Sequence, residues 1–303
     1  MTELTEFQRK IRQNLPEIVL SFDEPMREHT SFRIGGPAQV MAFPSDAAQL
    51  KKLLEMSAFL DTEPVILGAG TNVLAPDAGI RGLVICLKDC LGGMRQVDDT
   101  AVYVAAGVTM TRAAVFAANL GLAGMEFAHG IPGTVGGGVY MNAGAYGGEI
   151  CQICEFVDVM DRKGDIRTLT GEQMAFSYRH SVLEESGEIV LGARFRLQKD
   201  DPDAIRSRMK ELMARRSASQ PLDKPSAGSA FKRPVGGYAA ALIDQAGLRG
   251  FRVGDAAISE KHAGFAVNLG NATANDVKEL LRQVADKVYE HAGIMLEPEV
   301  RIW

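Results

Sequence analysis

Apolar residues recur every three or four positions in six segments of the chain, the spacing that places them on one face of a helix. The first segment runs from Leu4 to Leu15, and Ser45 precedes the second as its expected N-cap. Asp201 as N-cap and Pro202 at the first helical position open a later one. The other predicted helices span residues 111–120 before Gly121, residues 238–246 before Gly247, and a segment that starts at Thr273.

Shorter apolar runs, some of them alternating with polar residues, predict β-strands. The first, Val65–Leu67, leads into a glycine-rich loop, and residues 296–303 are expected to form a terminal strand. The other predicted strands are residues 83–87, 101–105, 156–160, 165–169 and 189–197. The hydrophilic stretch Lys199–Asp203 marks a change in composition. We therefore expect an α+β ligand-binding half up to about residue 200 and a smaller α+β half after it.

Length and composition are those of an ordinary globular protein of about two domains: 303 residues, 46% hydrophobic and 23% charged. The net charge of -5 disfavours a nucleic-acid partner, because binding to the phosphate backbone needs a strongly basic domain. The longest stretch without charged residues, 127–148, contains eight glycines and a proline, so we expect no membrane insertion. The acidic N-terminus with Glu3 and Glu6 lacks a signal-peptide pattern, which favours the cytoplasm.

The four cysteines have a spacing that could suggest a zinc or redox site. However, Cys86 lies in an apolar run typical of a buried strand, and Cys151 and Cys154 lead into an alternating strand pattern. A redox pair would instead sit at the N-terminus of a helix, where the thiol pKa is lowered. We therefore expect free, buried thiols and no metal site.

Two glycine-rich segments are candidates for ligand binding. Gly68–Asn72 follows a strand, but Pro76 and Gly79 come next and prevent the helix that a Rossmann loop would open. Its backbone N–H groups can still form an anion-binding nest, or the segment can be a tight connection. In the second segment, Gly121–Gly148, ten of 28 residues are glycine. That density is costly unless something approaches the backbone closely, and a large flat ligand with a diphosphate fits.

With this second segment the chain resembles the UDP-N-acetylenolpyruvoylglucosamine reductase family, bacterial cell-wall flavoenzymes. The other matching motifs follow in order: Thr30–Gly36, Gly68–Asn72, Ser177–Ser181, Gly228–Lys232 and Glu297–Arg301. The resemblance implies an α+β fold, with a two-subdomain FAD-binding module of the vanillyl-alcohol-oxidase (PCMH) type and a C-terminal α+β substrate-binding domain. It implies an N-terminal helical extension in 1–27, the FAD-binding domain in 28–200 with its subdomains split near 80, and the substrate domain in 201–303. Short loops around Tyr178 suggest the subtype without an extra tyrosine-bearing loop.

The resemblance also implies a reaction and its partners. The family reduces the enolpyruvyl group of a UDP-sugar to UDP-N-acetylmuramate for peptidoglycan synthesis. FAD is bound non-covalently, NADPH is the co-substrate, and we expect a monomer whose partners are small molecules. Hydride delivery to C3 builds negative charge at C2 and on the carboxylate, so the site needs a cation and a proton donor.

The catalytic residues implied by the matched motifs are Arg179, Ser229 and Glu299. Arg179 matches the arginine that stabilises the carboxylate, Ser229 matches the proton donor, and Glu299 matches a second acidic partner. Without the resemblance they would be a surface arginine, a turn serine and an ion-paired glutamate. The implied FAD contacts are Arg33, Gly68, Ala69, Gly70, Thr71, Asn72, Gly133, Thr134, Val135, Gly136 and Gly137.

A basic segment gives further candidates. From Arg206 to Arg233 there are eight Lys or Arg and only two acids, which suits an anionic ligand. We expect Arg206, Arg208 and Lys210 only to solvate a helix face. The predicted substrate contacts are Tyr178, Arg216, Lys232 and His262. His29 and His129 are expected to be structural, and Arg233 stands where many relatives have Asn.

Two other functions remain open. An FAD-dependent oxidase of the same superfamily would account for the N-terminal two thirds but not for Ser229, Lys232 and Glu299. A non-catalytic flavin-carrying electron-transfer subunit would need a partner protein and would show no turnover alone.

Overall fold

The computed structural model describes residues 4–303, and the contacts within it group the chain into two units. Unit 1 comprises Met1–Phe22, described from Leu4, with Val40–Ala69 and Gly82–Arg215; unit 2 comprises Asp23–Gln39, Gly70–Arg81 and Arg216–Trp303. This grouping differs from a boundary near residue 200. Helix α6 (Pro202–Ser219) buries Ile205 and Met209 in the core of unit 1. The boundary between the units therefore lies near the end of this helix, after Arg215.

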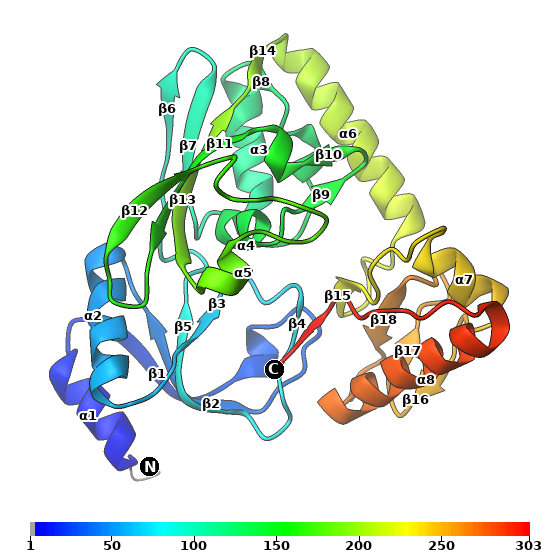
Figure 1. Ribbon diagram of the computed structural model, residues 1–303, viewed down its shortest axis with the longest axis horizontal. Helices are drawn as coiled ribbons and strands as arrows, with labels where there is room; N and C mark the ends of the chain where they lie inside the picture. The colour runs from blue at the N-terminus through cyan, green and yellow to red at the C-terminus, as the bar shows by residue number, and fades with distance from the viewer. Residues whose placement is uncertain (1–3) are drawn as a thin grey trace. The chain divides into compact units, whose positions relative to one another are not determined.

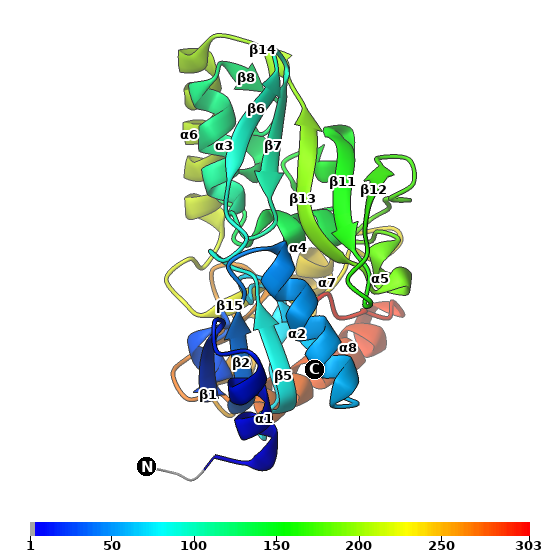
Figure 2. The same cartoon turned by 90° about the vertical axis from the view of Figure 1, so that its left-hand side faces the viewer.

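The largest sheet of unit 1 has five antiparallel strands in the order β12-β11-β13-β7-β6, which Figure 2 shows side by side. Its strands are β6 (Met94–Asp98), β7 (Ala101–Ala105), β11 (Cys154–Met160), β12 (Ile166–Thr170) and β13 (Ile189–Arg196). Alternation in β7 buries Val102 and Val104 in the core, with helices α3 (Met110–Asn119) and α4 (Val135–Tyr140). Tyr103, on the other face, lies under the guanidinium of Arg95.

A second sheet has the order β1-β2-β5-β3, in which β3 and β5 are parallel. Its strands are β1 (Val19–Pro25), β2 (Pro37–Phe43), β3 (Val65–Leu67) and β5 (Ile80–Cys86). Helices α1 (Glu6–Asn14) and α2 (Ala47–Phe59) share its core. The expected cap of α2 was wrong by one residue: Asp46, not Ser45, accepts the hydrogen bond from the Gln49 N–H at 2.8 Å.

Unit 2 contains a four-stranded sheet in the order β15-β18-β17-β16, against which helix α8 packs (Figure 1). The strands are β15 (Ser226–Ser229), β16 (Arg252–Val253), β17 (Ala256–Ile258) and β18 (Phe265–Asn268), and the helices are α7 (Ala239–Gln245) and α8 (Ala274–Ala292). Thr273 caps α8 as predicted. The carboxylate of Asp77 accepts a 2.7 Å hydrogen bond from the Ala274 N–H, which joins segment 70–81 to the C-terminal part.

The remaining elements are short: η1 (Met26–Glu28), β4 (Val73–Leu74), β8 (Leu122–Ala123), η2 (Glu126–Ala128), β9 (Gly144–Ala145), β10 (Gly148–Glu149), η3 (Ile150–Gln152), α5 (Leu183–Ser186), β14 (Gln198–Lys199) and β19 (Arg301–Ile302). The predicted terminal strand is thus much shorter than expected. Among residues 4–303, no helix has the length and apolar character needed to cross a membrane.

The cysteines are free, but the expectation that all are buried was wrong. Cys86 and Cys154 are buried, whereas Cys151 is exposed because it lies on the surface turn η3. Burial raises the pKa of Cys154 to about 12, which makes its thiol unreactive. In the described part of the chain, no three His, Cys, Asp or Glu side chains are placed to hold a metal ion.

Candidate active site

Gly68, at the start of the first glycine-rich loop, approaches Thr134 of the second within unit 1. A Cβ atom on Gly68 would lie 2.7 Å from the hydroxyl oxygen of Thr134, so only glycine permits this approach. Thr134 is 2% exposed and caps α4, its hydroxyl accepting from the Gly137 N–H at 3.4 Å. The backbone at Gly68 and the start of α4 at Thr134 therefore lie side by side, although they are far apart in the sequence.

Both loops carry backbone donors without a partner in the protein. Over residues 4–303, the N–H groups of Ala69, Gly70, Gly133 and Thr134 donate no hydrogen bond to another protein group. Buried or half-buried N–H groups are nearly always paired in folded proteins, so these donors indicate a ligand with acceptor oxygens.

Packing within the protein accounts for part of the glycine run. A Cβ on Gly136 would lie 3.0 Å from the Cβ of Ala106, and one on Gly138 would lie 2.7 Å from the sulfur of Met110. These glycines let α4 approach β7 and α3. A Cβ on Gly137 would come no closer than 3.7 Å to its nearest neighbour, Thr134. The dense glycine therefore serves both helix packing and an open backbone face.

Arg179 lies at the tip of a tight turn in unit 1. Ser177 and His180 exchange backbone hydrogen bonds of 3.1 and 3.3 Å, and Arg179 has a φ of +58° between them. Glycine is favoured in that conformation, which costs another residue of order 1 kcal/mol. The guanidinium donates to the Gly144 carbonyl at 3.3 Å and lies over the Tyr178 ring, 4.9 Å from its centre. Tyr178 itself is 44% exposed.

Asn142 fixes this turn to the neighbouring hairpin. Its buried side-chain amide donates to the Ser177 carbonyl at 2.9 Å and to the Glu149 carboxylate at 3.2 Å. Its amide oxygen accepts from the Cys151 N–H at 2.9 Å. The turn that presents Arg179 is therefore held by a satisfied, buried polar network.

Ser229 lies at the end of β15 in unit 2. An extra residue in β15 makes a bulge against β18, and Gly228 occupies it with a φ of +79°. Ala227 and Ala230 on either side are buried, whereas Ser229 is exposed. The bulge thus directs the hydroxyl of Ser229 away from the core.

Glu299 is brought next to Ser229 by the backbone. Its N–H donates to the carbonyl of Ala230 at 3.0 Å, and Lys232 and Glu297 share a second backbone bond of 2.8 Å. Asn72 donates to the Glu299 carbonyl at 3.1 Å, so the first glycine loop reaches the same segment. Two of the three predicted catalytic residues, and one predicted FAD contact, therefore belong to one hydrogen-bonded cluster.

Residues 38–170 match the family model of an FAD-binding domain, and residues 220–303 match that of the C-terminal domain of UDP-N-acetylenolpyruvoylglucosamine reductase. A protein of that name from Agathobacter rectalis is 46% identical over 98% of this chain and 98% of its own length. Another, from Pseudothermotoga lettingae, is 45% identical over 94% and 98%. The chain belongs to the UDP-N-acetylenolpyruvoylglucosamine reductase family.

Solved structures agree. The UDP-N-acetylenolpyruvylglucosamine reductase of Thermus caldophilus superposes with a TM-score of 0.80 at 36% identity, over 94% of this chain and 98% of that one. An alkyldihydroxyacetonephosphate synthase is similar in fold alone, with a TM-score of 0.50 at 15% identity over 65% of this chain and 41% of its own. The predicted family, α+β fold with a PCMH-type FAD-binding domain, and FAD-dependent oxidoreductase class are confirmed.

FAD, the cofactor of this family, fits the residues present. Its diphosphate needs several donors, and the unpaired N–H groups of Ala69 and Gly70 in the first loop would supply two of them without any added charge. Arg33 lies in segment 30–36, where it is exposed between the buried residues Phe32 and Ile34 and has a φ of +55°. Ser31 links this segment to the first loop, because its N–H donates to the Gly70 carbonyl at 3.0 Å.

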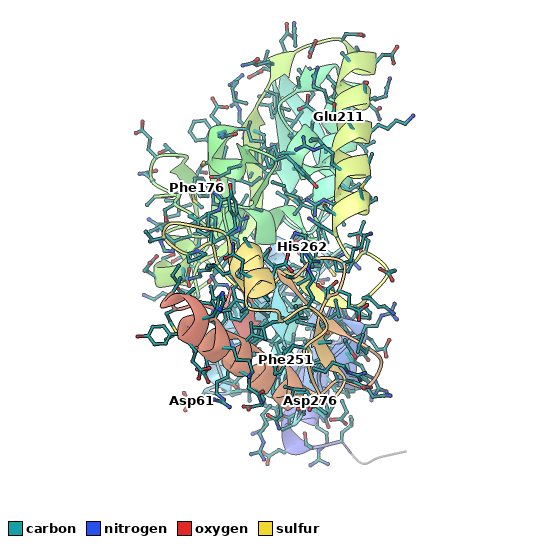
Figure 3. The ribbon with its side chains drawn as sticks, turned by 90° about the vertical axis from the view of Figure 1, so that its right-hand side faces the viewer. Asp61, Phe176, Glu211, Phe251, His262 and Asp276 are labelled. Atoms are coloured by element: carbon teal, nitrogen blue, oxygen red, sulfur yellow. The ribbon has the colours of Figure 1, made fainter. Side chains whose placement is uncertain are left out.

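The other predicted family residues lie in unit 2. Lys232 forms an ion pair with Glu297, and Arg216 is 7% exposed and donates to the Gln220 side chain at 3.0 Å. His262, labelled in Figure 3, lies in the loop after β17 and accepts from the Gly264 N–H at 3.1 Å through Nδ1. Burial, the larger cause, and the nearby Arg249 charge lower the pKa of His262, so its ring is neutral near pH 7.

Arg206 forms an ion pair with Asp203, and Arg208 forms ion pairs with both Glu126 and Asp200. The sequence pattern gave no role to Asn142 or to Tyr146, which has a φ of +55° at the tip of the β9–β10 hairpin. Gly147, the second residue of this two-residue turn, is the sequence signal that indicates a hairpin at this place.

Proposed function

We propose that the chain reduces the enolpyruvyl group of UDP-N-acetylglucosamine enolpyruvate to UDP-N-acetylmuramate, with NADPH as electron donor and non-covalently bound FAD. Its relatives carry the name of a reductase of this compound. We place the reaction in the cytoplasm, as a step of peptidoglycan precursor synthesis. The chain acts as a monomer whose partners are the UDP-sugar and NADPH.

The observation that most supports the proposal is the joining of Ser229 to Glu299 in unit 2. The backbone bond from Glu299 to Ala230 places an acidic residue beside the segment that carries the proposed proton donor. An oxidase of an alcohol would need no group that delivers a proton to carbon.

Bound FAD supplies the hydride relay from NADPH to C3 of the substrate. Arg179 then stabilises the negative charge that develops on the substrate carboxylate, because its planar fork can bind both oxygens. The strained turn supports this role. Glycine would adopt this backbone conformation with less strain, so the presence of an arginine is explained by a function of its side chain.

Ser229 donates the proton that C2 requires, and its exposure on the bulge leaves the hydroxyl accessible to substrate. Glu299, half-buried beside it, is the second acidic partner. The product therefore gains one hydride at C3, from NADPH, and one proton at C2.

Lys232, Arg216, Tyr178 and His262 are the proposed contacts of the substrate. The Lys232 side chain is 38% exposed and its partner Glu297 is 70% exposed, so their ion pair contributes little. Lys232 can therefore leave the Glu297 carboxylate and bind a phosphate of the substrate, and breaking the ion pair costs little free energy. The neutral ring of His262 can donate one hydrogen bond through Nε2, because Nδ1 already accepts.

The proposal is tested by supplying the FAD-loaded chain with NADPH and the enolpyruvyl UDP-sugar under nitrogen. Mass spectrometry should show a product two hydrogens heavier, with one NADPH consumed per product. NADPH consumption that requires oxygen and gives no heavier product would support an oxidase instead. Absence of turnover under both atmospheres would favour an electron-transfer subunit.

A further inference from the structure

Asn142 is a buried polar residue that has no part in the reaction as described so far. It lies shortly after helix α4, is 1% exposed and has a φ of +44°, a conformation that asparagine tolerates better than most residues. Its amide uses both N–H donors, on Ser177 and Glu149, and its oxygen accepts from the Cys151 N–H. A buried amide with all these bonds holds the segments that it contacts in fixed positions.

The first of these segments is the turn that carries Arg179. At one end of the turn, the Ser177 carbonyl accepts from the Asn142 amide at 2.9 Å. At the other end, the buried Ser181 hydroxyl donates to the carbonyl of Tyr140 at 2.7 Å. Both ends of the turn are therefore attached to the chain around the end of α4.

The second segment is the hairpin that accepts the Arg179 guanidinium. Gly144 of β9 pairs with Glu149 of β10, and the Gly144 carbonyl accepts from Arg179 at 3.3 Å. The Glu149 carboxylate accepts from the Asn142 amide at 3.2 Å. Asn142 therefore links the turn from which Arg179 extends to the strand pair that its guanidinium reaches. Without this amide, the direction of the guanidinium would be less well defined.

We propose that Asn142 is a positioning residue for Arg179, which sets the direction of the guanidinium toward the substrate carboxylate. Its side chain is covered by protein atoms, so it acts on the reaction only through other residues. The inference rests on the role of Arg179 in the proposed function, because direction matters only if the guanidinium acts on substrate. A misplacement of about 1 Å can slow a reaction by about a hundredfold.

The test is a double-mutant cycle, followed in the two half-reactions of the full-length, FAD-loaded chain. Asn142→Gly removes the three side-chain hydrogen bonds and keeps the backbone conformation, because glycine adopts a positive φ readily. We expect it to slow flavin reoxidation by the enolpyruvyl UDP-sugar about tenfold to a hundredfold, and to change flavin reduction by NADPH by less than about twofold. In the Arg179→Ala background the same substitution should slow reoxidation no further, since the group that it positions is absent. Single-turnover reoxidation under nitrogen, followed for hours, measures the slow rates of the Arg179→Ala variants.

Two further variants separate positioning from a general loss of structure. Glu188→Gln breaks the ion pair of a buried carboxylate elsewhere in unit 1, and it should leave both half-reactions unchanged. Asn142→Asp keeps the size of the side chain and the acceptor for the Cys151 N–H, but it loses both donors. It should therefore slow reoxidation at least as much as Asn142→Gly, and normal reoxidation in Asn142→Asp would contradict the proposal.

Hydrogen exchange in the turn gives a readout that does not depend on the reaction. Ser177 and His180 bond to each other's carbonyls, and their N–H groups should exchange about fivefold to twentyfold faster in Asn142→Gly, with the amides of β13 unchanged. Unchanged exchange in the turn would overturn the proposal, as would equal slowing of both half-reactions or an undiminished effect of Asn142→Gly in the Arg179→Ala background. If Arg179→Ala alone does not slow reoxidation, the role given to Arg179 in the proposed function fails instead, and the exchange measurement decides whether Asn142 holds the turn.

Discussion

Arg179 has a left-handed backbone conformation that glycine would adopt with less strain. Replacement by Gly and by Ala should abolish turnover equally, since both remove the guanidinium. The Gly variant should be more stable than the Ala variant by about 1 kcal/mol, because both lose the same contacts and only Ala retains the strain. Urea unfolding and steady-state assays measure the two effects.

The matched variant Arg179→Lys tests the chemistry at the same position. An ammonium lacks the planar fork, so it should not restore activity. Turnover of Arg179→Lys near that of the unmodified chain would remove Arg179 from the carboxylate. Equal stability of the Gly and Ala variants would show that the backbone at Arg179 is not strained.

Ser229 allows the two half-reactions to be separated. Ser229→Ala should leave flavin reduction by NADPH nearly unchanged, because that step does not use the C2 proton. Reoxidation by the enolpyruvyl substrate should slow by about a hundredfold to ten-thousandfold, the usual contribution of a positioned general acid. Stopped-flow flavin absorbance measures both rates. Equal slowing of both would give Ser229 a structural role, and no slowing of either would remove it from catalysis.

Sequence reasoning at the residue level located motifs but not their geometry. Ser229 and Glu299 could be named from matched motifs, whereas their link through Ala230 depends on strand pairing across about 70 residues. The unpaired N–H groups of Gly133 and Thr134 could not be foreseen, because hydrogen bonding is a property of the folded chain. The strain at Arg179 was equally invisible, since nothing in Tyr-Arg-His indicates a positive φ.

Helix α4 offers a comparison between packing and cofactor binding. Gly136→Val should destabilise the flavin-free protein by about 1–3 kcal/mol, because its side chain would overlap buried Ala106. Gly137→Ala should leave that protein at least as stable, since its Cβ meets nothing closer than 3.7 Å and alanine favours a helix. It should nevertheless weaken FAD binding, because Gly137 lines the proposed flavin face. Thermal unfolding and FAD titration of both variants test this, and normal FAD affinity of Gly137→Ala would contradict it.

The Arg167–Glu188 pair joins β12 to the start of β13 and gives unit 1 a pH dependence. Arg167 donates to both carboxylate oxygens of Glu188, at 2.6 and 2.7 Å, and the Glu188 side chain is only 6% exposed. The Arg167 hydrogen bonds lower the pKa of Glu188 below its ordinary value. A lowered folded-state pKa means that the stabilisation is complete above the unfolded pKa, near 4.5, and is lost as the pH falls below it.

Glu188→Gln should therefore destabilise the protein by about 1–2 kcal/mol at pH 7 and by progressively less below pH 4.5. Asp203→Asn breaks the exposed pair with Arg206 and is the matched control, with little effect at either pH. Urea unfolding at several pH values gives both comparisons. A Glu188→Gln effect that stays constant down to pH 3 would show that the charge of Glu188 does not matter.

The sequence predicted most of the long elements, because caps and apolar spacing are local signals. Strand β7 has the predicted bounds, and Thr273 caps α8 as expected. Helix α4 was missed because three glycines hide its pattern, and its stability comes from packing against Ala106 and Met110. The short strands β15–β18 were missed because they are poor in the branched residues that indicate strands.

At the scale of the molecule, sequence order and spatial grouping differ. Segments 23–39 and 70–81 belong with the C-terminal residues, so unit 2 collects the motifs at 30–36, 70–72, 226–232 and 297–301 from the whole length of the chain. A single boundary near residue 200 does not describe this grouping, because it assigns the first two motifs to the FAD-binding half.

In the proposed reaction, electrons from this flavin reach the enolpyruvyl UDP-sugar. The most direct measurement is anaerobic reoxidation of the NADPH-reduced, FAD-loaded chain, followed at the flavin absorption band after addition of that substrate. We predict complete reoxidation within one turnover, with one lactyl product formed per flavin, and only slow reoxidation when air replaces the substrate. Flavin that stays reduced with the enolpyruvyl UDP-sugar but reoxidises rapidly in air would contradict the claim.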